Sequence, residues 1–153
     1  MAGQLWMCGK HAIGPDPEAL LADIDATTVV CLTERFELED RYPQYVAWLD
    51  SNQPTRAVWL AIADMHAPSL DESQRLVADI RSRLAAGERI IIHCAAGLGR
   101  AGTVVACLLV SMGMTVQAAL AHVGAHRPMA GPEAGVQRAL IDAVHAAGCS
   151  TCG

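Results

Sequence analysis

The chain has no cluster of basic residues, no internal repeat and no low-complexity linker. Its 11 lysines and arginines are scattered and its formal net charge is −5, so a nucleic acid is not an expected partner. Without a repeat or a linker, residues 1–153 are expected to form a single domain. No basic segment followed by an apolar run precedes Gly14 and Pro15, so the sequence predicts a cytoplasmic protein without a secretory leader.

Acidic and basic side chains are absent from residues 101–126, a length that could cross a bilayer. Gly113, Thr115 and Gln117 interrupt this segment, which is typical of one helix ending and another beginning. Two buried helices are therefore expected rather than a membrane span. A disulfide framework is not expected either, because a chain that is 52% hydrophobic can form a core without one. The six cysteines then fit a reducing compartment.

Strand-like and helix-like segments alternate along the chain, which is typical of an α/β fold. The class expected is a single central, mostly parallel β-sheet of about four or five strands, flanked by helices on both faces. Strands are expected at 5–7, 27–32, 56–62 and 89–93, and helices at 16–24, 43–51, 70–86, 101–112, 116–123 and 132–146. A charged loop is expected at 34–41, and Gly148 is expected to follow the end of the last helix.

A tight loop between a β-branched strand and a helix contains the most informative residues. Cys94 begins this loop and Arg100 ends it. Between them lie only small or apolar residues: Ala95, Ala96, Gly97, Leu98 and Gly99. Backbone N–H groups that converge at a helix N-terminus bind anions, and the same field favours a thiolate at Cys94. Arg100 can offer a planar fork to two oxygens of a tetrahedral oxyanion, so the pattern predicts thiolate attack on phosphorus.

Asp64 is the second catalytic candidate, in a loop after a predicted strand. A leaving alkoxide or phenolate needs a proton, which a nearby carboxyl group can deliver. Structural roles compete with both candidates: Asp64 as a solvated turn residue, and Cys94 as an inert core residue. Asp71 competes with Asp64, but its place in a helix-capping box already explains it. The conjunction of His93, Cys94, two glycines and Arg100 favours the catalytic interpretation.

The segment HCAAGLGRAGT, which contains His-Cys-x-x-x-x-x-Arg, resembles the signature of the cysteine-dependent protein tyrosine and dual-specificity phosphatases. It looks most like the small branch that includes the cyclin-dependent-kinase-associated phosphatase. Residues 59–64 are similar to the family's strand and general-acid loop, and residues 125–128 to the Arg-Pro that follows its penultimate helix. The resemblance covers most of the chain, and its strongest part is 90–110.

The resemblance implies a dual-specificity-phosphatase-like fold and a cysteinyl-phosphate intermediate on Cys94. It implies that residues 95–100 bind the substrate phosphate, that Asp64 is the general acid and that His93 supports the loop. The implied partner is a phosphorylated protein or peptide, with phosphotyrosine included and dual specificity expected. No metal or cofactor is implied, and a monomer that does not bind membranes is expected. The loop lacks the lysines of the phosphoinositide-phosphatase branch, which disfavours a highly charged lipid headgroup.

Three positions depart from the family pattern. The Ser or Thr that usually follows the arginine is Ala101, so turnover is expected to be slower unless Thr103 partly substitutes for it. The proline that commonly precedes the general acid is Ala63. Gln137 lies near the position of a glutamine that orients the hydrolytic water, but one residue away. Arg127 can either bind substrate phosphate or merely follow a helix end.

Other classes of function remain as alternatives. A rhodanese-like sulfurtransferase also places a cysteine among backbone amides, and a pseudophosphatase binds phosphate without turnover. A metal-binding module could use residues with ligand spacing, namely His122, His126, Cys149 and Cys152. Cys31 ends a strand that could approach Cys94, as a redox partner or as a core residue.

Overall fold

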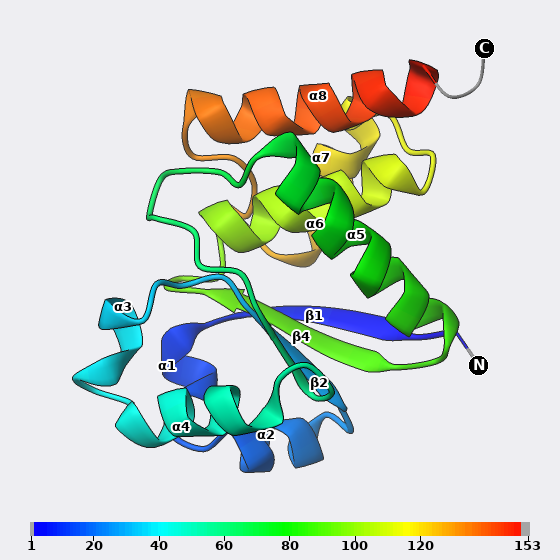
Figure 1. Cartoon of the computed structure of the whole chain (residues 1–153). Helices are drawn as coiled ribbons and strands as arrows, with labels where there is room; N and C mark the ends of the chain where they lie inside the picture. Colours follow the sequence, from blue (N-terminus) through cyan, green and yellow to red (C-terminus); the bar gives the residue numbers. More distant parts are fainter. Residues whose placement is uncertain (1, 151–153) are drawn as a thin grey trace.

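A four-stranded parallel sheet runs through the middle of the computed structural model, which describes residues 2–150 (Figure 1). The strands are β1 (Gln4–Gly9), β2 (Thr28–Cys31), β3 (Ala57–Trp59) and β4 (Arg89–Cys94). Their order is β1-β4-β2-β3, and each of the three neighbouring pairs is parallel. The carboxyl ends of β1, β4 and β2 therefore lie at the same edge of the sheet. The expected class, a mostly parallel sheet of four or five strands, is confirmed.

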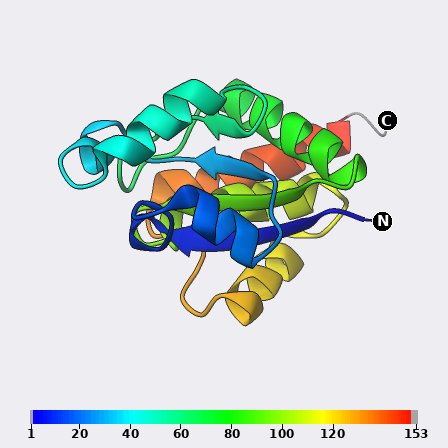
Figure 2. The same cartoon turned by 90° about the horizontal axis from the view of Figure 1, so that it is seen from below.

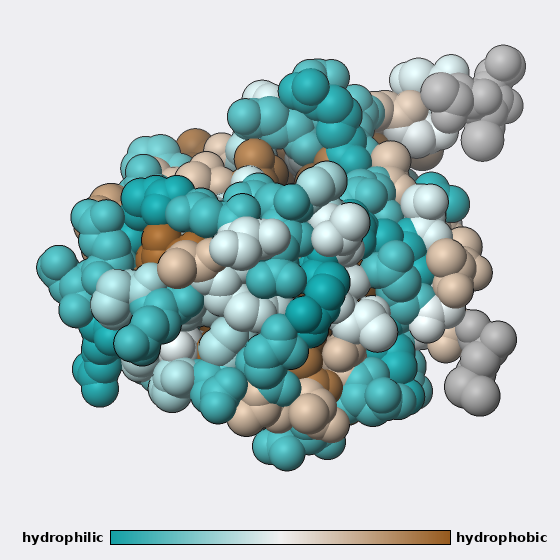
Figure 3. Space-filling view, turned by 60° about the horizontal axis from the view of Figure 1, so that its bottom comes forward, coloured by the Kyte–Doolittle hydropathy of each residue, from teal (hydrophilic) through white to brown (hydrophobic). Residues whose placement is uncertain are grey.

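Helices cover both faces of the sheet, as Figures 1 and 2 show. One face carries α1 (Lys10–Ile13), α2 (Pro17–Asp23), α3 (Phe36–Glu39) and α4 (Pro43–Asn52). The other carries α5 (Leu70–Ala85), α6 (Gly99–Ser111), α7 (Val116–His126) and α8 (Gly135–Ser150). Two apolar clusters form the core, one on each face, and they are divided by the sheet. The outer surface seen in Figure 3 is mostly hydrophilic, with small apolar patches.

Strand β4 divides its side chains between the two clusters because successive residues of a strand point to opposite faces. Ile90 and Ile92 pack into the cluster under α5–α8, and Ile91 packs into the cluster under α1–α4. All three are at most 1% exposed. Burial of side chains of this size stabilises the fold by about 1.5–3 kcal/mol each. The strand that leads into the candidate loop is therefore fixed from both sides.

Helix α6 continues from the loop into the interior, and 11 of its 13 residues are buried. Its Cys107 and Val104 are at most 1% exposed. This burial explains the lack of charged side chains in α6. Residues 101–126 form two helices as expected, but α7 is not buried as expected, since its only buried residues are Ala119 and Val123. No helix within residues 2–150 is long and apolar enough to cross a membrane.

Several helix starts agree with the sequence signals. The side chains of Asp16 and Thr115 accept hydrogen bonds from the N–H groups three residues later, and Ser69 forms a capping box with Glu72.

Several expected boundaries are wrong. Helix α7 continues to His126 rather than ending at residue 123, and α8 begins at Gly135 rather than at residue 132. The expected loop at 34–41 contains α3, which is stabilised by a hydrogen bond from Glu34 N–H to Glu37 Oε2 and by the buried Leu38. Strand β3 ends at Trp59, although Leu60 N–H still donates to Cys31 O at the end of β2 and Ile62 N–H donates to Leu32 O. Helix α8 continues through Gly148 to Ser150, because a glycine weakens a helix without necessarily ending it.

Candidate active site

The loop after β4 directs its backbone carbonyl groups outward, and each carbonyl from Cys94 to Gly99 has a hydrogen-bond donor. Three donors are side chains: His93 for Cys94, Arg127 for Ala96 and Gly97, and Thr103 for Gly99. The other donors are backbone N–H groups: Lys10 for Ala95, and Gly102 and Gly131 for Leu98. Because a trans peptide holds its C=O and N–H on opposite sides, these bonds point the N–H groups the other way.

The N–H groups of this loop lack an acceptor in the part of the chain that the structure describes. Among residues 2–150, no backbone oxygen or side chain accepts from the N–H groups of 95–100. Gly97 allows the tight course of the loop, because its φ of +74° and a carbonyl at Cys8 leave no room for a Cβ atom. A set of unpaired N–H groups at a helix N-terminus is an anion-binding site.

His93 is fully buried and holds the start of the loop through both ring nitrogens. Its Nδ1–H donates to the Cys94 carbonyl at 3.2 Å, and its Nε2 accepts from the Tyr45 hydroxyl at 2.6 Å. Burial lowers the pKa of His93 from 6.5 to about 4, against the opposing effect of the Cys94 carbonyl, so the ring is neutral at pH 7. Tyr45 thereby fixes the tautomer that donates to the loop.

Arg100 is held at the end of the loop by an acidic side chain from α3. Its Nη1 and Nη2 atoms donate to the two carboxylate oxygens of Glu37 at 2.8 and 2.9 Å, and Nη1 also donates to the Ile62 carbonyl at 2.8 Å. The Arg100 side chain is only 2% exposed. These contacts use the Nη1–Nη2 edge of the guanidinium, so the Nε–Nη2 edge stays available to a second oxyanion.

Glu37 and Arg100 each stabilise the charged form of the other. Burial by itself would raise the pKa of the Glu37 carboxyl, but the hydrogen bonds from Arg100 and the Glu34 N–H outweigh it, and the pKa lies below its usual value. Burial opposes the charge of Arg100 as well, but Glu37 and the nearby Cys94 and Asp64 raise the pKa of the guanidinium. Both groups are therefore charged at neutral pH.

Asp64 lies at the rim of the loop rather than inside it. Its Oδ1 is 3.6 Å from Arg100 Nη2, and its side chain is 71% exposed. The same Oδ1 accepts from the Met65 N–H at 3.0 Å, and the Asp64 carbonyl is 2.8 Å from His66 Nδ1. A carboxyl group in this place is near the anion site and exposed to solvent.

The other described cysteines that are buried or partly buried are poor nucleophiles. Burial raises the pKa of Cys8 to about 12 and the pKa values of Cys31 and Cys107 to about 11. Cys31 packs in the cluster under α1–α4, 3.3 Å from the Thr33 hydroxyl, whereas Cys94 packs in the cluster on the opposite face. This placement favours core packing for Cys31 over a redox role with Cys94.

A family model described as "Swiss Army Knife protein, DSP-PTPase phosphatase domain" matches residues 5–146. The chain belongs to this DSP-PTPase phosphatase family. The family resemblance expected from the signature segment is therefore confirmed, and the loop from Cys94 to Arg100 lies where the signature predicts it.

Relatives of the DSP-PTPase domain share its fold over nearly the whole chain. Tk-PTP in its active form matches with a TM-score of 0.72 at 25% identity, covering 95% of this chain and 92% of that chain. Kinase associated phosphatase matches with a TM-score of 0.70, covering 98% and 85%, and at 20% identity it shows the fold alone. Dual specificity protein phosphatase 1 of Arabidopsis thaliana is 46% identical over 57 residues, which are 37% of this chain but only 29% of that relative.

Three residues of the DSP-PTPase domain have contacts that the sequence did not indicate. The Thr103 hydroxyl donates to Gly99 O at 2.6 Å, so its proton is directed to the helix backbone. Arg127 binds loop carbonyls and does not merely decorate a helix end. The side chain of Gln137 is fully buried and links two loops: its Nε2 donates to His66 O, and its Oε1 accepts from Glu133 N–H.

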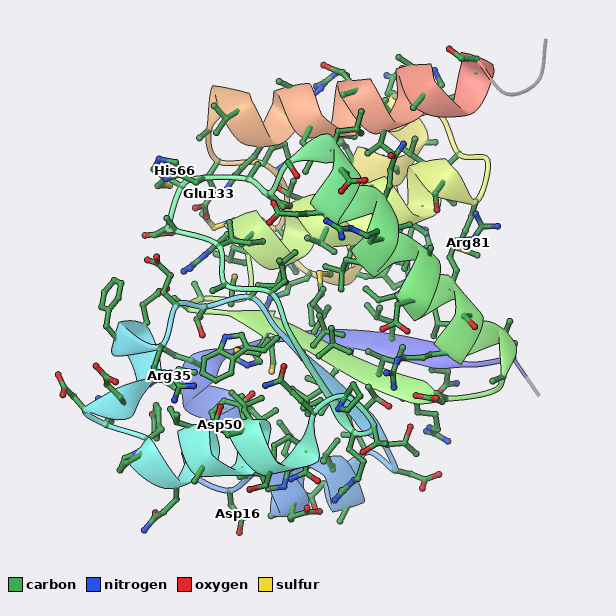
Figure 4. All side chains as sticks on the ribbon, in the orientation of Figure 1. Asp16, Arg35, Asp50, His66, Arg81 and Glu133 are labelled. Carbon is green, nitrogen blue, oxygen red and sulfur yellow. The ribbon has the colours of Figure 1, made fainter. Side chains whose placement is uncertain are left out.

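Gln137 thereby connects the loop of Asp64 with the loop between α7 and α8. His66 and Glu133 lie close together in Figure 4, beside the start of α6, and a Cβ atom on Gly99 would lie 2.7 Å from Glu133 Oε2. With its described bonds going to the backbone, Gln137 is better explained as a brace between loops than as a residue that orients water.

The zinc alternative has little support in the described part of the chain. No group of three or more His, Cys, Asp or Glu side chains within residues 2–150 could hold a metal ion. The rings of His122 and His126 are 4.2 Å apart, and His126 Nδ1 is 2.9 Å from the His122 carbonyl. Cys152 lies outside the described residues.

Proposed function

We propose that this domain is a phosphoprotein phosphatase of the dual-specificity type that acts on phosphotyrosine and forms a cysteinyl-phosphate intermediate. The observation that supports this proposal most strongly is the loop itself. Every backbone carbonyl from Cys94 to Gly99 points away from the anion site and accepts a hydrogen bond there. The inward N–H groups match the oxygens of a phosphoryl group, whose charge they stabilise as it develops in the transition state.

In the first step the Cys94 thiolate attacks phosphorus, an S–P bond forms and the bond from phosphorus to the leaving oxygen breaks. Cys94 is 3% exposed, so only a small part of this residue is open to an incoming phosphate ester. Arg100 holds two equatorial oxygens with its Nε–Nη2 edge. Asp64 gives its proton to the leaving oxygen.

In the second step water attacks phosphorus, Asp64 takes a proton from that water, and the S–P bond breaks to return the thiolate and release phosphate. The residue that follows Arg100 is Ala101, which offers no hydroxyl to the departing sulfur. Thr103 directs its hydroxyl to Gly99 O. Breakdown of the intermediate is therefore the slow step that we expect.

Hydrolysis of para-nitrophenyl phosphate in the presence of a chelator tests this proposal. We expect Cys94→Ser to abolish turnover, because serine supplies no thiolate, and Asp64→Ala to reduce kcat about 10²–10⁴-fold. The loss in Asp64→Ala is expected to be greater for alkyl phosphates, which have poorer leaving groups than aryl phosphates.

Cys149→Ser is the matched control, since Cys149 is an exposed thiol on α8 and its loss should leave the rate unchanged. A fully active Cys94→Ser protein would overturn the proposal. Phosphate binding without turnover in the wild type would indicate a pseudophosphatase, and rapid turnover of thiosulfate would indicate a sulfurtransferase.

A further inference from the structure

Within residues 2–150, Arg127 is the one side chain that binds two consecutive carbonyl groups of the loop. It follows α7, and its side chain reaches the loop some 30 residues earlier in the sequence. Its Nε donates to Gly97 O and its Nη2 donates to Ala96 O, both at 2.8 Å. Among the described residues, no carboxylate forms a salt bridge with Arg127. The hydrogen bonds of this guanidinium in the described structure therefore go to the loop backbone.

These two bonds fix the peptide groups on both sides of Gly97. Because the peptide is planar and trans, holding Ala96 O outward directs the Gly97 N–H inward, and holding Gly97 O outward directs the Leu98 N–H inward. Gly97 has a φ of +74° and no side chain, so the peptides beside it can rotate at lower cost than elsewhere in the loop. A rotated peptide would place a carbonyl oxygen where the phosphate oxygens bind.

We infer that Arg127 is a positioning residue that keeps the peptide groups flanking Gly97 in the anion-binding orientation. This inference rests on the proposed function and adds to it a residue that acts through the loop. Direct contact between Arg127 and substrate phosphate is the competing role, but Nε and Nη2 are already used on loop carbonyls.

The test compares Arg127→Met, Arg127→Lys and the control Arg138→Met. Arg138 is a surface arginine of α8 in an i,i+4 pair with Asp142, and its side chain is 52% exposed. Methionine keeps much of the bulk of Arg127 without donors, and lysine keeps the charge but cannot bind two carbonyls bidentately. Thermal unfolding of each variant checks that the fold is retained.

Three readouts are measured: kcat/KM for aryl and alkyl phosphates, inhibition by orthovanadate, and the rate of Cys94 alkylation by iodoacetamide as a function of pH. For Arg127→Met we expect kcat/KM to fall about 10²-fold for both substrates, since a small misplacement of binding groups has an effect of that size. Vanadate inhibition should weaken, and the rate of Cys94 alkylation at a given pH should change, because the N–H groups around the sulfur are no longer held in place. Arg127→Lys should recover only part of these losses.

Unchanged vanadate inhibition and alkylation in Arg127→Met would overturn the inference. Weaker substrate binding with an unchanged alkylation profile, fully restored by lysine, would also overturn it and would indicate direct charge contact with the substrate. If the wild type hydrolyses no phosphate ester, the proposed function fails, yet the alkylation readout still decides whether Arg127 orders the loop.

Discussion

At the scale of single residues, the ion pair between Arg100 and Glu37 is a contact that the sequence did not indicate. Glu37 lies in a stretch with several acidic residues, and nothing in the local pattern separates it from its neighbours Glu34 and Glu39. The contact joins residues 63 positions apart and depends on the short helix α3, where the sequence pattern predicts a loop. Long-range pairs of this kind follow from tertiary structure, which local propensity does not encode.

Replacing Glu37 should therefore affect Arg100, in addition to removing the hydrogen bond that Glu37 accepts from the Glu34 N–H at the start of α3. In Glu37→Ala, Arg100 loses both hydrogen bonds to the carboxylate, and the orientation of its guanidinium group is no longer fixed. We expect kcat/KM to fall about 10²-fold, and the free energy of unfolding to fall by about 3 kcal/mol, because a nearly buried charge loses its partner.

Glu37→Gln keeps an oxygen for Arg100 and should have a smaller effect on both quantities. Glu39→Ala, on the exposed side of the same helix, is the matched control and should behave as the wild type. Steady-state kinetics and urea unfolding at pH 7 measure these differences. Wild-type kinetics in Glu37→Ala would show that Arg100 does not need this partner.

At the scale of helices and strands, most elements could be predicted because each carries its own signal. The β-branched run of β4 and the caps of α2, α5 and α7 depend on residues close in sequence. The signature from His93 to Arg100 is local as well, which is why the sequence alone places the loop between a strand and a helix. The length of β3 and the end of α8 could not be predicted, since pairing and packing decide them.

Support for the loop comes from elements that are far apart in the chain. Tyr45 on α4 holds His93, Lys10 at the start of α1 holds Ala95, and Arg127 after α7 holds Ala96 and Gly97. None of these partners has a spacing signal, since each is brought to the loop by the folded sheet and its helices. Arg127 could be named from its Arg-Pro context, but its contact with the backbone could not.

At the scale of the whole molecule, the site couples to global stability through the buried ring of His93. Its pKa is about 4 in the folded protein and 6.5 in an ordinary environment, so the unfolded chain binds the proton more readily. The contribution of neutral His93 to stability is therefore fully present above about pH 6.5 and is lost as pH falls toward 4.

We expect the free energy of unfolding to be about 2 kcal/mol lower at pH 5 than at pH 7.5 because of this ring. Glu37 does not contribute in that range, since its lowered pKa affects stability only below about pH 4.5. Urea unfolding at both pH values measures the difference, and a His93→Gln variant should show a smaller one. A wild type that is equally stable at both pH values would contradict this expectation.

In the proposed mechanism the fold presents the sulfur of Cys94 within a ring of backbone N–H groups, and trapping the phosphorylated intermediate is the clearest test of this proposal. The enzyme is mixed with radiolabelled para-nitrophenyl phosphate, quenched in detergent within the first turnover and mapped by mass spectrometry. We expect one phosphoryl group on Cys94 of the wild type and none on Cys94→Ser. Label on another residue, or turnover without a labelled protein, would contradict it.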